Sequence, residues 1–63
     1  MNVKGYRVGA NLKISDVADR LGICRESYRR KENKIRRFTL EEAVELARMF
    51  GITIEEFYKA TKG

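Results

Sequence analysis

Residues 17–33 read VADRLGICRESYRRKEN. This stretch predicts two short helices joined by a tight turn. The first helix has an apolar stripe at helical spacing, which consists of Val17, Ala18 and Leu21. Gly22 ends that helix, because glycine takes the left-handed conformation of a helix end without steric cost. Cys24 stands where the second helix begins, and in that helix Tyr28 is expected to face the core. The side chains expected to face outward are Arg25, Glu26, Arg29 and Arg30.

The charge of the chain is unevenly distributed. Residues 1–37 contain eleven Lys and Arg against four Asp and Glu, whereas residues 38–63 contain three against five. Within residues 25–37 alone, seven basic residues accompany two acidic ones. A basic half joined to a mildly acidic half is typical of a protein with a polyanion-binding face. Two helices joined by a short turn, with long polar side chains on the second, form a motif that reads the major groove of DNA.

Length and composition exclude several classes of protein. The 63 residues allow one small domain, which we assign to residues 1–63. With one Cys and no His, the chain lacks the ligands of a zinc site and the partners of an internal disulfide. It has no phosphate-binding glycine loop, no apolar run near the roughly 20 residues that span a bilayer, and no signal-peptide pattern. We therefore expect a cytoplasmic, non-enzymatic protein without a metal, a cofactor or a membrane partner.

Local signals predict an all-α fold of five short helices. The first three are expected over residues 1–10, 14–21 and 24–32. Thr39 begins the fourth with a capping box that Glu42 completes three residues later, and a glycine at position 51 closes it. A similar pair, Thr53 and Glu56, opens the short final helix. The predicted apolar face of the fourth helix consists of Leu40, Ala43, Val44, Ala47 and Phe50. That of the final helix consists of Ile54, Phe57 and Tyr58.

Four segments carry a resemblance to a known family. They are ISDVADRLGI at 14–23, EN at 32–33, FTLEEA at 38–43 and FGITIEEF at 50–57. In this order and spacing they resemble the Cro/C1-type (Xre-like) helix-turn-helix family. With SYRRKEN before FTL, the chain is similar to small phage or mobile-element repressors of Gram-positive bacteria. The resemblance implies a lambda-repressor-like DNA-binding domain whose helix-turn-helix covers about residues 14–32.

The resemblance also implies roles for individual residues. Arg7 on the first helix is expected to pair with Glu32 at the end of the third, as a structural brace. The expected contacts to base edges are Arg25, Glu26 and Arg30. Contacts to the DNA backbone are expected from Cys24, Ser27, Arg29, Lys34, Arg36 and Arg37.

Three positions depart from the family pattern. Ile14 replaces a glutamine that usually contacts phosphate, so Lys13, Ser15 or backbone amides would have to make that contact. Lys34 replaces the glycine that usually follows the Glu-Asn pair, which predicts a different loop conformation. Cys24 replaces the usual Ser or Thr and is a weaker helix cap.

Several residues have a second interpretation. The arginines of residues 24–32 can form an ordinary solvated helix face. Glu26 either accepts from cytosine N4 or pairs with Arg30 one helical turn away. Phe57 and Tyr58 either both belong to the core or leave one ring exposed at a homodimer seam.

Taken together, the sequence predicts a sequence-specific regulator that binds double-stranded DNA. The simplest mechanism is a repressor that places its helix at 24–32 in the major groove of a two-fold operator. A homodimer would then read two half-sites about one helical turn apart. The alternatives are a protein-interaction module or antitoxin-like subunit with secondary DNA binding, and a binder of RNA or of nucleic acid without sequence preference.

Overall fold

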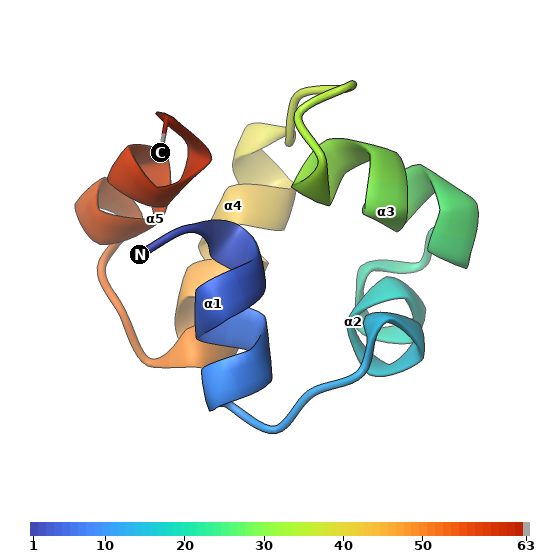
Figure 1. The fold of residues 1–63 in the computed structure, drawn as a ribbon, viewed down its shortest axis with the longest axis horizontal. Helices are drawn as coiled ribbons and strands as arrows, with labels where there is room; N and C mark the ends of the chain where they lie inside the picture. Colours follow the sequence, from blue (N-terminus) through green and yellow to red (C-terminus); the bar gives the residue numbers. More distant parts are fainter. Residues whose placement is uncertain (63) are drawn as a thin grey trace.

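The computed structural model describes residues 1–62 as five helices without a strand (Figure 1). The helices are α1 (Val3–Gly9), α2 (Ile14–Leu21), α3 (Arg25–Glu32), α4 (Leu40–Phe50) and α5 (Ile54–Lys62). The all-α fold with five short helices is therefore confirmed. In Figure 1, α2 and α3 form one side of the molecule and α5 lies on the opposite side, with α1 and α4 between them.

Short-range capping contacts begin the two C-terminal helices as the sequence predicts. The Thr39 backbone N–H donates to Glu42 Oε1 over 2.9 Å, and the Glu42 N–H donates to Thr39 Oγ1 over 3.1 Å. Thr53 and Glu56 exchange the same pair of bonds at 2.9 and 3.0 Å. Gly51 ends α4 with a φ of 71°, in the left-handed region. These contacts join residues three positions apart, which is why the sequence alone locates them.

The first helix is shorter than the predicted residues 1–10. It starts after Asn2, whose side chain accepts a hydrogen bond of 2.8 Å from the Gly5 N–H. It ends at Gly9, and Asn11 follows in the left-handed region with a φ of 64°. Asparagine is a better helix cap than methionine, so Asn2 caps the helix and Met1 lies before it.

The core joins all five helices through a small set of side chains. Its fully buried apolar members are Val3, Val17, Ala18, Tyr28, Leu46, Ala47, Phe57 and Ala60. Phe38, in the segment between α3 and α4, packs between two of them. Its ring centroid lies 6.1 Å from that of Tyr28 and 5.3 Å from that of Phe57. These three rings connect α3 to α5 through the loop that follows the second helix of the motif.

The predicted apolar faces of α4 and α5 are partly wrong. Leu40 is 74% exposed, whereas Leu46, which the prediction omitted, is fully buried. Leu40 is the first residue of α4 and lies beyond the edge of the core, while Leu46 follows two turns later where α4 crosses it. On α5, Ile54 and Tyr58 are 49% and 58% exposed, because the buried stripe of that helix runs through Phe57 and Ala60.

No helix within residues 1–62 is long and apolar enough to cross a membrane.

Leu46→Ala and Leu40→Ala test this assignment with the same chemical change on the same helix. We expect Leu46→Ala to lower the free energy of unfolding by about 3 kcal/mol, because it leaves a cavity in the core. Leu40→Ala should change it by less than about 0.5 kcal/mol. Urea denaturation followed by far-UV circular dichroism measures both. Similar losses from the two variants would contradict the assigned core.

Candidate nucleic-acid interface

A three-residue turn fixes α3 against α2. Gly22 takes a φ of 72°, and its N–H donates to the Asp19 carbonyl over 3.2 Å. The Ile23 N–H donates to the Ala18 carbonyl over 3.1 Å. Cys24 then caps α3 from an extended backbone conformation. The two helices have the bounds and the tight turn of a helix-turn-helix, with α3 in the position of the recognition helix.

The outer face of α3 carries four charged side chains. Arg25, Glu26, Arg29 and Arg30 are all exposed, whereas Tyr28 is fully buried on the opposite side of the helix. The predicted orientation of this helix is therefore present in the structure. The face is long and polar, and its charges project away from the rest of the protein.

The N-terminus of α3 is capped more weakly than by a serine or threonine. The Cys24 side chain makes no hydrogen bond to a backbone N–H, and its thiol instead donates to Ser27 Oγ over 3.1 Å. The hydrogen bond with the Ser27 side chain is the main reason that the pKa of the Cys24 thiol is lowered. Cys24 is exposed and Ser27 half-buried, so both lie at the start of the outer face.

Glu26 is engaged by two arginines of its own helix. Its Oε1 accepts from Arg29 Nη2 over 2.6 Å, and its Oε2 accepts from Arg30 Nε over 3.2 Å. The intrahelical interpretation of Glu26 is thus present in the protein without DNA, and it includes a second arginine that the sequence analysis did not anticipate. The hydrogen bond from Arg29 is the main reason that the pKa of Glu26 lies below its usual range.

A basic loop follows α3 and projects beside its C-terminal end (Figure 1). Lys34, Arg36 and Arg37 are exposed and form no ion pair within the described part of the chain. The backbone N–H of Ile35 donates to the Arg30 carbonyl over 2.8 Å, which ties the loop to the last turn of α3.

Lys34 adopts the backbone conformation that glycine favours. It takes a φ of 67°, which is the left-handed conformation that glycine adopts most easily. A lysine there costs roughly 1 kcal/mol more than glycine because its Cβ crowds the following carbonyl. Lys34 thus keeps the backbone conformation that a glycine favours, while a difference in the rest of the loop stays a prediction.

Lys31, in the middle of the basic run, points inward. Its Nζ lies 2.6 Å from Glu42 Oε2, and both side chains are nearly buried. Because Glu42 also caps α4 through Thr39, this pair joins the end of α3 to the start of α4. Sequence analysis missed the pair; the only available signal was that Glu42 is the acidic member of a capping box.

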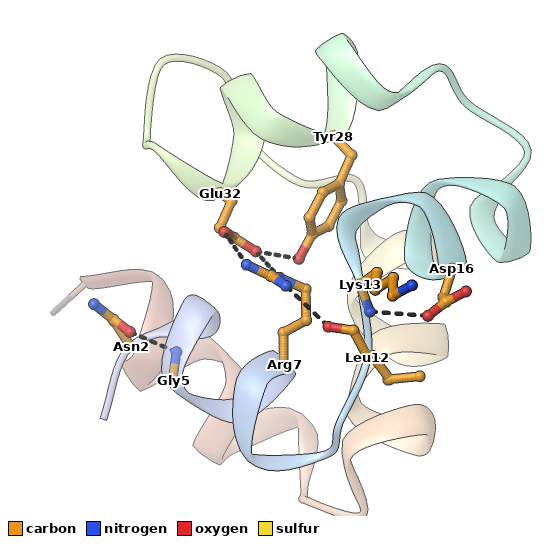
Figure 2. A network of polar contacts seen from close by, with 8 residues as sticks. All are labelled: Asn2, Gly5, Arg7, Leu12, Lys13, Asp16, Tyr28 and Glu32. Carbon is orange, nitrogen blue, oxygen red and sulfur yellow. Dashed lines mark hydrogen bonds and ion pairs between the residues drawn. The ribbon is translucent and has the colours of Figure 1, made fainter.

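A buried polar network holds α3 against α1 (Figure 2). Arg7 donates from Nε to Glu32 Oε2 over 2.8 Å and from Nη2 to Glu32 Oε1 over 3.2 Å. Arg7 Nη1 donates to the Leu12 carbonyl over 2.9 Å, and the Tyr28 hydroxyl donates to Glu32 Oε2 over 2.6 Å. The pair expected between Arg7 and Glu32 is present. Tyr28 was expected in the core with its hydroxyl at an edge, but the hydroxyl lies inside this network.

The pKa values of both Arg7 and Tyr28 are raised within the network. The hydrogen bond to Glu32 is the main reason that the pKa of Arg7 is raised. Burial, followed by the hydrogen bond to Glu32, raises the pKa of the Tyr28 hydroxyl far above its usual value. Both shifts favour the forms that make the network at neutral pH, with the Tyr28 hydroxyl protonated as a donor and Arg7 as a cation.

Ile14 occupies the position at the start of α2 where the family usually has a glutamine that contacts phosphate. Ile14 is half-buried and packs against the core, so it offers no polar contact to a ligand. Lys13 is exposed, and its backbone N–H is already bonded to Asp16 Oδ2 over 2.9 Å. Of the groups considered for this position, the Lys13 side chain is exposed and Ser15 is half-buried.

Residues 1–62 bring together no group of three His, Cys, Asp or Glu side chains suited to a metal ion.

Glu32→Ala tests the network, with Glu45→Ala as the control, because the Glu45 side chain is 29% exposed and that of Glu32 is 5% exposed. Arg7 would be left buried without its carboxylate, so we expect Glu32→Ala to lower the free energy of unfolding by about 3 kcal/mol. Glu45 pairs with Arg20, whose side chain is 62% exposed, and its removal should cost less than about 1 kcal/mol. Chemical denaturation measures both values, and equal losses would contradict a structural role for the network.

Comparison with known proteins agrees with this geometry. The sequence model of the helix-turn-helix family matches residues 3–57, which include α1 to α4 and the beginning of α5. No curated protein and no solved structure gives a significant match to the chain. Because the family match covers most of the chain and the structure has the corresponding helices in order, the protein belongs to the Cro/C1-type helix-turn-helix family of DNA-binding regulators.

Proposed function

We propose that the protein is a sequence-specific regulator of transcription that binds an operator in double-stranded DNA and represses by occupying it. The observation that carries this proposal is the position of four cations without an ion pair among the described residues. Arg25 lies at the first turn of α3, and Lys34, Arg36 and Arg37 follow its last turn. The protein acts in this proposal by binding alone.

The spacing of these cations fits a DNA duplex. The eight helical residues of α3 extend over about 12 Å, which is about the width of a major groove. With α3 in the groove, the loop of residues 33–39 would lie against one phosphate strand. The buried network of Arg7, Glu32 and Tyr28 would hold α3 at a constant angle to both strands.

Base edges and phosphates would be contacted by different residues. Arg25 and Arg30 suit the two acceptors of guanine, and Glu26 suits the amino group of cytosine. At the start of α3, Cys24 and Ser27 can donate hydrogen bonds to the phosphates of the DNA backbone. The remaining backbone contacts would come from Arg29, Lys34, Arg36 and Arg37, which supply affinity and salt dependence.

A groove with apolar and basic lining supports binding as a homodimer. It has a volume of about 620 Å³, and its lining includes the exposed side chains of Leu40, Ile54 and Tyr58. Lys34, Arg36 and Arg37 of the basic loop also line it, so a second copy would have to cover the apolar part and leave the loop to DNA. Phe57 is buried at its floor, so Tyr58 is the aromatic ring of α5 that a second copy would cover. A two-fold dimer would read two half-sites, whereas one α3 reads only a few base pairs.

The same groove also favours a second candidate, a protein-interaction module for which DNA binding is secondary. Its main complex would then survive high salt and depend on Phe57, Tyr58 and Met49, of which Phe57 and Tyr58 line the groove, because apolar contacts are insensitive to screening. The operator proposal predicts the opposite dependence on salt, since its main contacts are ionic.

Selection of binding sites from random duplex DNA tests the proposal. We expect enrichment of an inverted repeat whose half-site centres lie about one helical turn apart, because two copies of α3 would enter successive major grooves. Enrichment of a single half-site would contradict the dimer. Binding without any enriched sequence, or binding of RNA with equal affinity, would contradict the operator proposal.

Arg30→Ala and Arg37→Ala separate base reading from phosphate binding. We expect Arg30→Ala to relax the base preference at one position of each half-site, at a cost of about 1–3 kcal/mol on the selected sequence. Arg37→Ala should weaken binding to all sequences alike and reduce the salt slope by about one unit. Titrations of selected and scrambled duplexes at several salt concentrations measure both effects. Equal losses on the two duplexes from Arg30→Ala, and likewise from Arg25→Ala, would contradict direct reading by these arginines.

A further inference from the structure

Glu26 places a negative charge at the middle of the surface proposed to meet DNA. Residues two apart on a helix point about 200° from each other, so Glu26 lies nearly opposite the buried Tyr28. Arg29 and Arg30 lie on either side of it along the outer face. A carboxylate at this position would face a polyanion directly.

The two contacts of Glu26 remove two arginines from the set of available cations. Arg29 donates to one carboxylate oxygen over 2.6 Å and Arg30 to the other over 3.2 Å. Since these bonds hold the pKa of Glu26 below its usual range, the carboxylate is ionised at neutral pH. Of the three arginines on the outer face of α3, Arg25 alone lacks an ion pair within residues 1–62.

Different DNA sequences would meet this arrangement with different consequences. Phosphates and the acceptors of guanine compete with Glu26 for Arg29 and Arg30, and repel its carboxylate. A cytosine amino group facing Glu26 gives the carboxylate a donor in place of an arginine, so that Arg30 can turn to a neighbouring base. On a DNA sequence without that amino group, either the carboxylate has no partner or Arg29 and Arg30 stay paired with Glu26 and cannot contact the DNA.

We propose that Glu26 determines specificity chiefly by weakening the binding of the protein to non-operator DNA. It holds Arg29 and Arg30 in ion pairs that only a matching half-site releases. This inference rests on the proposed function, and it goes further by assigning to Glu26 an effect on sequences that the protein does not select.

The test is Glu26→Gln, which keeps the shape and hydrogen-bonding capacity of the side chain and removes its charge. Affinity is measured for the selected duplex and for a scrambled duplex of the same length and composition, at about 50 and 200 mM salt. We expect affinity for the scrambled duplex to rise about tenfold or more at the lower salt, with a steeper salt slope, because the freed arginines reach phosphates. The ratio of specific to non-specific affinity should fall by a similar factor.

Two further variants separate the ion pairs from the general change in charge. Glu55→Gln makes the same change on α5, on the opposite side of the fold from α3, where Glu55 is exposed and outside the ion pairs of the described chain (Figure 1). It should raise non-specific affinity much less than Glu26→Gln does. In a background of Arg29→Ala and Arg30→Ala, Glu26→Gln should raise non-specific affinity less than it does in the wild type, because only the direct repulsion between Glu26 and phosphate is then removed. Thermal melts of Glu26→Gln and the wild type should agree within about 5 °C, because Glu26 is on the surface.

The outcomes distinguish this inference from the function on which it rests. A wild-type protein that binds both duplexes equally overturns the operator proposal and this inference together. A wild-type protein that discriminates, with Glu26→Gln no different from Glu55→Gln on the scrambled duplex, overturns the inference alone. Loss of affinity for the selected duplex with an unchanged scrambled one also overturns it, because Glu26 would then act only as a base contact.

Discussion

The buried ion pair between Arg7 and Glu32 is the constraint on which the presentation of α3 depends. Removing two charges from water costs several kcal/mol for each ion, which their attraction offsets only with good geometry and further hydrogen bonds. Here Glu32 accepts from Arg7 twice and from the Tyr28 hydroxyl once, while the remaining donor of Arg7 reaches the Leu12 carbonyl. Few relative positions of α1 and α3 satisfy all four bonds, so the network specifies one orientation.

The basic residues at positions 25–37 have three different roles. Of the seven basic side chains in residues 25–37, one is paired with α4, two are paired with Glu26, and four have no ion pair in the described structure. Lys31 stabilises the junction of α3 with α4 and is therefore unsuited to contact DNA. The charge count of a basic segment thus overstates the number of cations that a ligand can reach, because neighbouring carboxylates already engage some of them.

The sequence predicted the helices more accurately than the core. The bounds of α2 agree with the prediction, and the capping residues of α4 and α5 were identified, because each signal lies within four residues. The faces of α4 and α5 were misassigned at Leu40, Leu46 and Ile54, and of the two interpretations of Phe57 and Tyr58 the structure has the one with one exposed ring, that of Tyr58. Helical periodicity defines a stripe, but where the stripe enters the core depends on how far neighbouring helices extend along it. That distance is set by packing and is not encoded in the local pattern.

By itself, the sequence determined the bounds of α2 and α4, the start of α5, and the tight turn at Gly22. It also determined the position of α3 as an arginine-bearing second helix and the membership of the family. These properties follow from dihedral preferences and from hydrogen bonds between near neighbours. Only the tertiary structure decided which charges are available. Arg7 and Glu32 are 25 positions apart and Lys31 and Glu42 are 11 apart. The partners of Glu26 lie within one helical turn. Only the side-chain conformations show that Arg29 and Arg30 each donate to one of its carboxylate oxygens. Ion pairs between helices form only where the fold brings two side chains within a few ångströms, and that proximity does not exist before the helices pack.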